Sequence, residues 1–486
     1  MSLVHALRKL ARQSPARSSA WKWLSVGIGV KRWLVVLLAG ITILSLGVAY
    51  LFVSIYREQP FPDFVYYLTL QFVPRAVRAV LFGTVGILLV AFGLYKLNQA
   101  LLAGLPSRPV SLVENLYRKR MRQRGLKIVC IGGGTGMSTL LRGLKNYSDN
   151  LTAIITVADD GGSSGRLRQE LGVLPPGDFR QCIAALADAE PLMARLLEYR
   201  FPNDTGLGGH AFGNLFIAAM AGVTGNSERA LLEASRVLAV RGTILPSTLE
   251  DVTLCAEVRG THESQIARVT GESQIAKFGK PVERVYLEPE RVPAYPGAVR
   301  ALLDADLIIA GPGSLYTSVL PNLLVEQICQ AATVSPALKL FVCNVATERG
   351  ETDHYTVEDY LQALHNHCAG FEFDGILINN QVTGTLPPQA RIDFVAPRGN
   401  AAAGNAAAGN AAAGNAAARR SGTETVPYIF ADVVDDERPW RHDSEKLARA
   451  ILRWYTKRTK VTTLTRHHSA MLEQAEKQGS REQVVQ

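Results

Sequence analysis

Three polar segments of this 486-residue chain carry residue types that suit a nucleotide diphosphate. They are GGGTG at 132–136, DDGGSSGR at 159–166 and PPGDFR at 175–180. Glycines let phosphate oxygens approach backbone N–H groups, carboxylates accept hydrogen bonds from ribose hydroxyls or bind Mg²⁺, and arginines offer forked donors to phosphate. The three segments together predict a nucleotide-diphosphate pocket.

The glycine segment lies between a strand-like run and a helix-like run. Residues 127–131 are apolar and β-branched, as in a buried parallel strand, and 137–145 have the apolar spacing of a helix. The glycines therefore lie at a helix N-terminus, where free N–H groups and the helix dipole favour an anion. The G-x-G-x-x-G and P-loop patterns are not met, so a tight turn without a ligand is the alternative. The predicted phosphate-binding residues are Gly132, Gly133, Gly134, Thr135 and Gly136.

Asp159 and Asp160 end a second apolar run, 151–158, which predicts a parallel strand beside the first. Two adjacent carboxylates suit ribose hydroxyls, a base-edge donor or a hydrated Mg²⁺, the one cofactor we expect here. A solvated turn is the alternative, and helix capping is an equal explanation for Asp178. The other candidates from these segments are Ser163, Ser164, Arg166, Arg168 and Arg180.

Two later glycine-rich loops also adjoin predicted strands or helices. GGHAFGN at 208–214 precedes a segment with the apolar spacing of a helix, and GPGSLYTS at 311–318 follows a short, wholly apolar run that predicts a strand. His210 is predicted to contact phosphate or act as an acid, and the Tyr316 ring to stack on a base. A purely structural role is an equal alternative for both. The other candidates from these loops are Asn214, Gly313 and Ser314.

The N-terminal part of the chain has a different composition. Residues 33–56 and 79–95 are apolar, uncharged runs of 24 and 17 residues, against the about 20 that a bilayer crossing needs. Residues 1–32 carry seven basic side chains and no acidic one, and 96–127 carry eight against Glu114 alone. Segments rich in Lys and Arg beside a membrane span stay in the cytoplasm. We therefore expect a two-span hairpin in the plasma (inner) membrane, with both termini and the rest of the chain in the cytoplasm; a buried core helix is the alternative for 79–95.

The charge distribution argues against nucleic-acid binding. The chain is formally +9, but residues 1–127 hold 18 basic and 3 acidic side chains, which leaves a net charge of −6 for the rest. The basic part should favour anionic lipid headgroups, and the remainder lacks the positive charge that nucleic acid requires. The six cysteines are scattered without C-x-x-C spacing, so we expect most of them to be buried thiols in a reducing compartment.

Alternating strand-like and helix-like runs after the basic part predict an α/β domain with a mostly parallel sheet. Residues 250–287 alternate apolar and polar side chains and predict antiparallel strands beside that sheet. Near the C-terminus we expect a strand at 426–430 and a helix at 444–456 with a serine cap. The predicted parts are a basic N-terminus (1–32), the hairpin (33–95), a basic linker (96–126), the α/β domain (127–456) with a flexible insertion of four GNAAA units (399–418), and a polar tail (457–486).

Several segments resemble the YvcK family of gluconeogenesis factors, within the CofD-like superfamily that includes the 2-phospho-lactate transferases. The resemblance covers about 127–396 and resumes at 426–452. By motif position Gly133, Gly134, Thr135 and Asp160 correspond to ligand-pocket residues of the superfamily, and Asn214 and Tyr316 also lie in matching segments. Those segments are IGGGTGMS at 131–138, TVADDGGSSGRLR at 156–168, LPPGDFR at 174–180, GHAFGN at 209–214, GPGSLYTSVLP at 311–321 and TERGETD at 347–353.

This resemblance implies a Rossmann-like domain of three layers that binds UDP-sugars, notably UDP-N-acetylglucosamine. It also implies a role in cell shape and envelope synthesis during gluconeogenic growth. The transferase relatives bind a guanine nucleotide and a deazaflavin and move a phospho-lactyl or similar group with Mg²⁺. Two functions therefore stay open: a nucleotide-sugar-binding regulator, which we favour because no nucleophile-base set stands out, and an Mg²⁺-dependent transferase.

Overall fold

The computed structural model divides the chain into two compact units, Met1–Met121 and Arg122–Gln486. The residues that it describes are 39–51, 53, 63–68, 70, 72–103, 122–123, 125–188, 191–259, 266–381, 386–387, 391–398, 417–419 and 425–459.

The residues of the first unit that the structure describes as regular are helical. It contains a helical segment at 39–51, α4 (Asp63–Leu68) and α5 (Arg75–Ala103). The first predicted span, 33–56, extends beyond the described residues, and the second, 79–95, is a 17-residue part of α5. No helix in the described part of the chain combines the length and the apolarity that a membrane crossing requires. The structure therefore gives no support to the predicted hairpin.

The second unit is built on an eight-stranded sheet with the order β10-β11-β9-β8-β7-β1-β2-β3. All neighbouring pairs are parallel except β10 with β11. The sheet strands are β1 (Ile128–Gly132), β2 (Leu151–Ile155), β3 (Thr243–Pro246), β7 (Leu307–Ala310), β8 (Leu338–Val342), β9 (Gly375–Asn379), β10 (Ala417–Arg419) and β11 (Thr425–Ala431).

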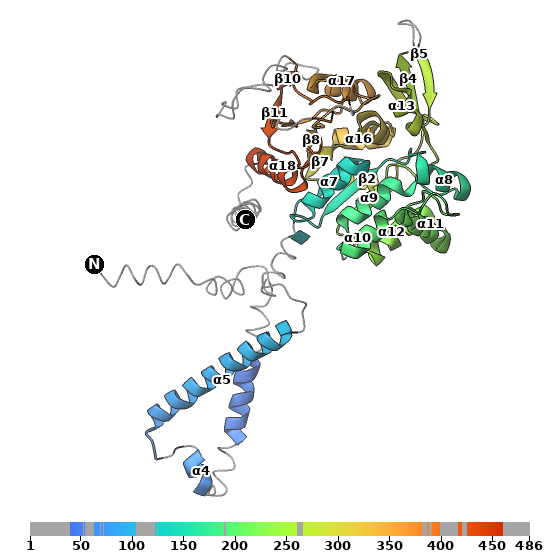
Figure 1. The fold of residues 1–486 in the computed structure, drawn as a ribbon. Helices are drawn as coiled ribbons and strands as arrows, with labels where there is room; N and C mark the ends of the chain where they lie inside the picture. The colour runs from blue at the N-terminus through green and yellow to red at the C-terminus, as the bar shows by residue number, and fades with distance from the viewer. Residues whose placement is uncertain are drawn as a thin grey trace. The chain divides into compact units, whose positions relative to one another are not determined.

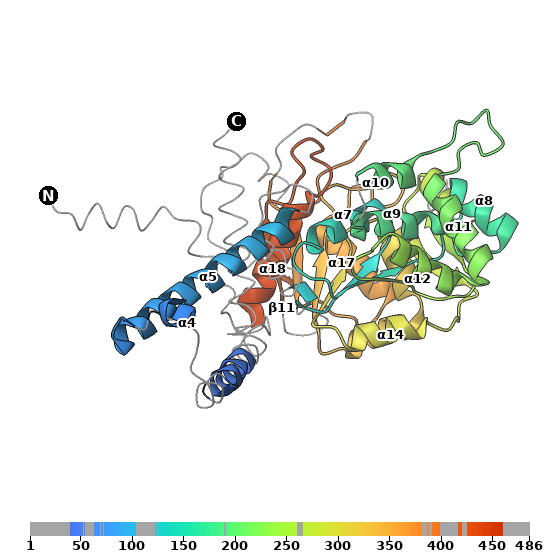
Figure 2. The same cartoon turned by 90° about the horizontal axis from the view of Figure 1, so that it is seen from below.

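Helices cover both faces of this sheet (Figures 1 and 2). On one face α9 packs beside α7, and α18 packs on α7; on the other face α14 packs on α16. The helices of the unit are α7 (Gly134–Leu144), α8 (Gly162–Leu171), α9 (Pro176–Leu186), α10 (Pro191–Glu198), α11 (Phe212–Thr224), α12 (Ser227–Val237), α13 (Glu272–Phe278), α14 (Pro296–Leu303), α15 (Leu320–Leu323), α16 (Glu326–Val334), α17 (Val357–His367) and α18 (Ser444–Thr459). The predicted three-layer α/β fold is confirmed.

The apolar runs of the sequence form the centre of the core. All five residues of β1 are buried, as expected for a strand with neighbours on both sides and helices on both faces. The buried side of α7 includes Met137, Leu140, Leu141 and Leu144, at helical spacing. Burial of such side chains contributes about 1.5–3 kcal/mol each, so this strand-helix unit holds the glycine loop between them rigidly in place.

A separate three-stranded antiparallel sheet, with the order β5-β4-β6, follows β3 in the chain. It consists of β4 (Thr253–Arg259), β5 (Ile266–Thr270) and β6 (Val282–Glu288). The antiparallel strands predicted within 250–287 are thus confirmed.

The cap of the last helix, α18, differs from the prediction. Asp443, and not Ser444, caps this helix, because the Asp443 carboxylate accepts the backbone N–H groups of Glu445 and Lys446.

The cysteines divide into two groups. Cys130, Cys182, Cys255 and Cys343 are buried free thiols, as expected for most of the six. Cys329 on α16 and Cys368 at the end of α17 form a disulfide with a Cα–Cα distance of 6.3 Å. They are 39 residues apart, so spacing alone gave no sign of the pair.

Gly143 tests the packing of α18 on α7. A Cβ atom at this position would overlap the backbone carbonyl oxygen of Ser444. We expect Gly143→Ala to lower the free energy of unfolding by about 1–3 kcal/mol, because α18 has to shift. The measurement is urea denaturation followed by circular dichroism. Gly222→Ala on α11 is the control, since nothing lies within 4 Å of its Cβ position; equal midpoints in the two variants would contradict the described contact.

Candidate functional site

The order of the strands predicts a ligand-binding crevice at the carboxyl ends of β1 and β7. β1 lies between β2 and β7, and the chain leaves β1 toward β2 but leaves β7 toward β8, in the opposite direction along the sheet. Ligands of open parallel sheets bind where the strand order reverses in this way. The loops after β1 and β7 meet at this predicted crevice, and both contain residues predicted from the sequence to bind ligand.

The loop after β1 is shaped for close approach by its glycines. Gly133 is the extended N-cap of α7, and Gly134 has a left-handed φ of +63°. A Cβ at Gly136 would come within 2.5 Å of the Pro312 carbonyl oxygen. The N–H groups of the first turn of α7 have no intrahelical acceptor, and the one of Gly134 donates to Asp178. Gly132 is buried, whereas the exposed Thr135 donates its hydroxyl to Gln181.

Two asparagine side chains fix the β7 loop to its surroundings. Asn344 accepts the N–H of Gly313 at 3.1 Å and donates to the Gly313 carbonyl oxygen at 3.0 Å. Asn322 donates to the carbonyl oxygens of Gly132, at 3.0 Å, and Ser318, at 2.8 Å. The main chain at the ends of β1 and β7 is therefore held by the buried Asn322 and the half-buried Asn344, and neither asparagine was predicted as a site residue.

The carboxylates of Asp159 and Asp160 separate instead of acting as a pair. Asp159 accepts the N–H of Gly161 at 2.8 Å and bonds to Ser164. Asp160 accepts the N–H of Ser273 at 2.8 Å, at the start of α13. Among the described residues no group of three or more His, Cys, Asp or Glu side chains could hold a metal ion. Mg²⁺ commonly takes only one or two protein carboxylates and completes its shell with water and substrate phosphate, so the Mg²⁺ site at Asp159 and Asp160 stays a prediction, and we derive no step through it.

Four further acidic side chains approach this edge of the sheet. Burial, and then the charge of Asp159, raises the pKa of the Asp178 carboxyl to about 7. Burial also raises the pKa of Glu272 well above its usual value, with Asp159, Asp178, Glu351 and Asp160 as further causes. Burial raises the pKa of Glu348 and of Glu351 as well. The sequence analysis did not select these three glutamates, although Glu348 and Glu351 lie in the matching segment 347–353.

The predicted polar residues of α8, α9 and the 208–214 loop form one buried network. Asn214 donates to Ser163 Oγ at 3.1 Å, and Ser163 Oγ shares a hydrogen bond of 3.0 Å with His210 Nδ1. Arg180 Nε donates to Asn214 Oδ1 at 3.0 Å. Burial, and then the positive charge of Arg166, lowers the pKa of His210, which favours the neutral ring. This network fixes the 208–214 loop on α8.

The other two arginines predicted to bind phosphate also bond to loops of the protein. Arg166 donates to the Gly208 carbonyl oxygen at 2.8 Å. Arg168 forms an ion pair with Asp251 and donates to the Val252 carbonyl oxygen. As placed, both guanidinium groups hold loops together, and their contact with phosphate stays a prediction.

Tyr316 belongs to the core. Its side chain is 2% exposed, and its hydroxyl lies 2.8 Å from that of Tyr355. The ring makes edge contacts with Tyr355 and His367. A ring packed in this way cannot stack on a base, so the structural alternative for Tyr316 is the one the structure supports. Its neighbour Ser314 bonds to Glu348.

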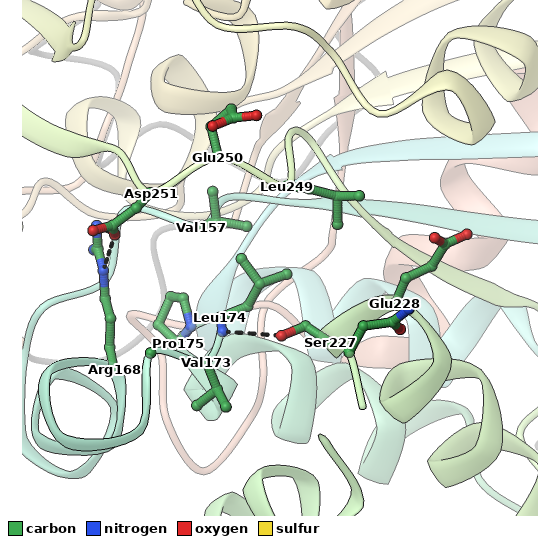
Figure 3. A pocket seen from close by; sticks show the side chains of 12 residues that line it. Val157, Arg168, Val173, Leu174, Pro175, Ser227, Glu228, Leu249, Glu250 and Asp251 are labelled. Atoms are coloured by element: carbon green, nitrogen blue, oxygen red, sulfur yellow. Dashed lines mark hydrogen bonds and ion pairs between the residues drawn. The ribbon is translucent and has the colours of Figure 1, made fainter. Parts of the chain in front are cut away.

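A pocket of about 310 Å³ opens at the carboxyl ends of β2 and β3 (Figure 3). Val157, Leu174 and Leu249 give it apolar walls, while the Arg168–Asp251 pair and the bond from the Leu174 N–H to Ser227 Oγ, at 3.4 Å, lie on two sides of it. Of the predicted site residues, only Arg168 lines this pocket.

Comparisons with known proteins point to a single group. The profile of the family described as 2-phospho-L-lactate transferase CofD matches residues 128–392. A Nostoc sp. protein provisionally named a gluconeogenesis factor is 42% identical over 93% of this chain and 97% of its own length. The gluconeogenesis factor of Bacillus subtilis is 49% identical over 52% of this chain and 79% of its own length. A crystal structure of a UPF0052 family member from Bacillus halodurans covers 67% of this chain and 98% of its own, with 40% identity and a TM-score of 0.58.

Asp178→Asn should change how stability depends on pH. With a folded-state pKa of about 7 against about 3.9 in the unfolded chain, Asp178 binds more protons when folded between pH 4 and 7. Its contribution to stability is therefore present at low pH and lost as the pH rises through this window. We expect the variant to gain stability relative to the unsubstituted protein from pH 5 to pH 8, measured by urea denaturation.

The control for this experiment is Asp204→Asn, which removes one carboxylate from an exposed turn. A stability difference between Asp178→Asn and the unsubstituted protein that stays constant from pH 5 to pH 8 would show that Asp178 is not a buried, proton-binding group.

Proposed function

Because the chain belongs to the gluconeogenesis factor family of CofD-like proteins, we propose that its α/β unit binds a nucleotide diphosphate sugar such as UDP-N-acetylglucosamine. In this proposal the protein is a regulator of cell shape and envelope synthesis during gluconeogenic growth. Occupancy of the crevice by the nucleotide sugar is the signal, and no reaction is needed.

The observation that carries the proposal is the start of α7. Gly133 and Gly134 begin α7 at the carboxyl end of β1, and the first-turn N–H groups of this helix have no intrahelical acceptor. A helix N-terminus stabilises an anion by about 0.3–1 kcal/mol, and by up to about 2 kcal/mol in a partly buried site. A micromolar ligand needs about 8 kcal/mol. The nucleoside and the sugar therefore have to supply most of the binding energy, which favours a large ligand over free phosphate.

The geometry favours binding over catalysis. Among the predicted residues, Ser163 and His210 are in contact like a nucleophile and its base. Both side chains are buried, however, and Ser163 Oγ already accepts a hydrogen bond from Asn214. The match to the transferase profile supports the alternative, an Mg²⁺-dependent transfer of a phospho-lactyl-like group. That alternative predicts consumption of the nucleotide-linked donor.

The membrane placement belongs to the same proposal and rests on the sequence. The net charge of residues 1–127 is +15, which suits anionic lipid headgroups, and the apolar runs lie within this part of the chain. A two-span anchor in the plasma (inner) membrane would keep the α/β unit in the cytoplasm, where the nucleotide sugar is made and used.

Calorimetric titration of the full chain with UDP-N-acetylglucosamine, UDP and GDP, with and without Mg²⁺, tests the function. We expect UDP-N-acetylglucosamine to bind with a Kd on the order of micromolar, about tenfold tighter than UDP or GDP. Chromatography of the ligand afterwards should return it intact. Tighter binding of GDP, with consumption of an added acceptor, would establish the transferase, and absence of binding would overturn the proposal.

Gly133→Ala tests the position of the phosphate. The new Cβ would overlap Asp178 Oδ2 and lie 3.4 Å from Thr156 Cγ2, so the loop has to move. We expect UDP-N-acetylglucosamine affinity to fall about tenfold or more, which is about 1.4 kcal/mol. Gly206→Ala on an exposed turn, where nothing lies within 4 Å of the Cβ position, should leave the affinity unchanged. Equal affinities in the two variants would place the phosphate elsewhere.

A further inference from the structure

Two buried carboxyl oxygens lack a hydrogen-bond partner among the described residues. They are Glu272 Oε2 and Glu351 Oε2. The Glu351 residue is only 5% exposed, so bulk water does not solvate it. Leaving a buried polar atom unpaired costs about 1–3 kcal/mol, and more when the group is charged. Such atoms in a native fold mark places where a bound molecule completes the hydrogen bonding.

Both carboxyl groups belong to the acidic cluster at the carboxyl edge of the sheet. The Glu272 carboxyl interacts electrostatically with Asp159, Asp178, Glu351 and Asp160, which come from the loop after β2, the start of α9 and the loop after β8. It therefore points toward the carboxyl edge of the sheet, where Asp178 bonds to the Gly134 N–H.

The backbone near Glu351 brings it close to α13. A Cβ at Gly350 would lie 2.5 Å from the Ala276 carbonyl oxygen, so the loop after β8 packs directly on the helix that carries Glu272. The two unpaired oxygens thus come from neighbouring segments that are far apart in the sequence.

One half of the Glu351 carboxyl is held firmly by the protein. Oε1 accepts the Thr317 hydroxyl at 3.1 Å. The bond to Oε1 positions the start of the π-helix η1 (Leu315–Val319). It does not explain why Oε2 has no hydrogen-bond partner. Because the protein already orients the Glu351 carboxyl, binding of a ligand to Oε2 requires little further ordering of this side chain.

The chemistry of the cluster selects the ligand group. Phosphate oxygens are disfavoured beside these carboxyls when they are ionised, since like charges repel in a buried setting. A metal ion lacks a set of three ligating side chains in the described part of the chain. A sugar hydroxyl both donates and accepts, so it suits a carboxyl in either protonation state. This matters here because burial raises the pKa of both groups.

We infer that Glu272 and Glu351 bind the hydroxyl groups of the sugar attached to the pyrophosphate, and that they set the preference for nucleotide sugar over bare nucleotide. This inference rests on the proposed function. In this arrangement the glycine loop binds the anionic middle of the ligand and the two glutamates bind its uncharged end.

Glu272→Gln and Glu351→Gln test the assignment, with Glu290→Gln as the control because the Glu290 side chain is 77% exposed. The full chain is titrated with UDP-N-acetylglucosamine and with UDP, and the ratio of the two Kd values is compared. We expect each of the first two variants to reduce the preference for the sugar about tenfold while the Kd for UDP changes by less than about threefold. The control should keep the preference of the unsubstituted protein.

Each other outcome has a defined meaning. A preserved preference in both variants, or equal weakening of both ligands, overturns the sugar assignment alone. A preference that exists only with Mg²⁺ also overturns it, because a metal ion then fills the place of the hydroxyls. No binding of either ligand by the unsubstituted protein overturns the proposed function itself. Urea midpoints of the variants establish that each is folded, and Glu272→Gln keeps the test valid if Glu351→Gln loses the start of η1.

Discussion

The contact between the loops after β1 and β7 is the constraint on which the rest of the site depends. It exists because Gly136 has no side chain: a Cβ there would come within 2.5 Å of the Pro312 carbonyl oxygen. Asn322 and Asn344 then hold the two loops with amide hydrogen bonds. Because main-chain atoms make this contact, its shape is set by the backbone and by the core beneath it.

Electrostatics divide the edge of the sheet into two regions. The start of α7 presents amide N–H groups, which favour an anion when the neighbouring Asp178 carboxyl is neutral, while Glu272 and Glu351 present carboxyls that an anion avoids when they are ionised. The three arginines expected near phosphate instead bond to protein groups, for example Arg180 to Asn214. A ligand with a charged middle and a hydroxyl-rich end fits such a division better than a nucleotide alone.

The small antiparallel sheet has a direct part in the site. Asp160, at the end of the second parallel strand, accepts the N–H of Ser273 and so ties α13 to the main sheet. Through this bond the segment 266–288 brings Glu272 to the crevice. Asp160, which was predicted to bind ligand, thus connects the two sheets. It positions the helix that carries Glu272, whose Oε2 atom is buried and unpaired.

The sequence by itself determined the parallel sheet, the glycine-capped start of α7 and the antiparallel strands, because apolar periodicity and glycine placement act locally along the chain. It could not determine the partners of polar side chains. Tyr316 is in the core, Asp160 bonds to Ser273, and Cys329 pairs with Cys368 only because distant segments meet in the folded chain. The burial that leaves Glu272 and Glu351 with unpaired oxygens is likewise a property of the whole fold, since it depends on which loops cover them.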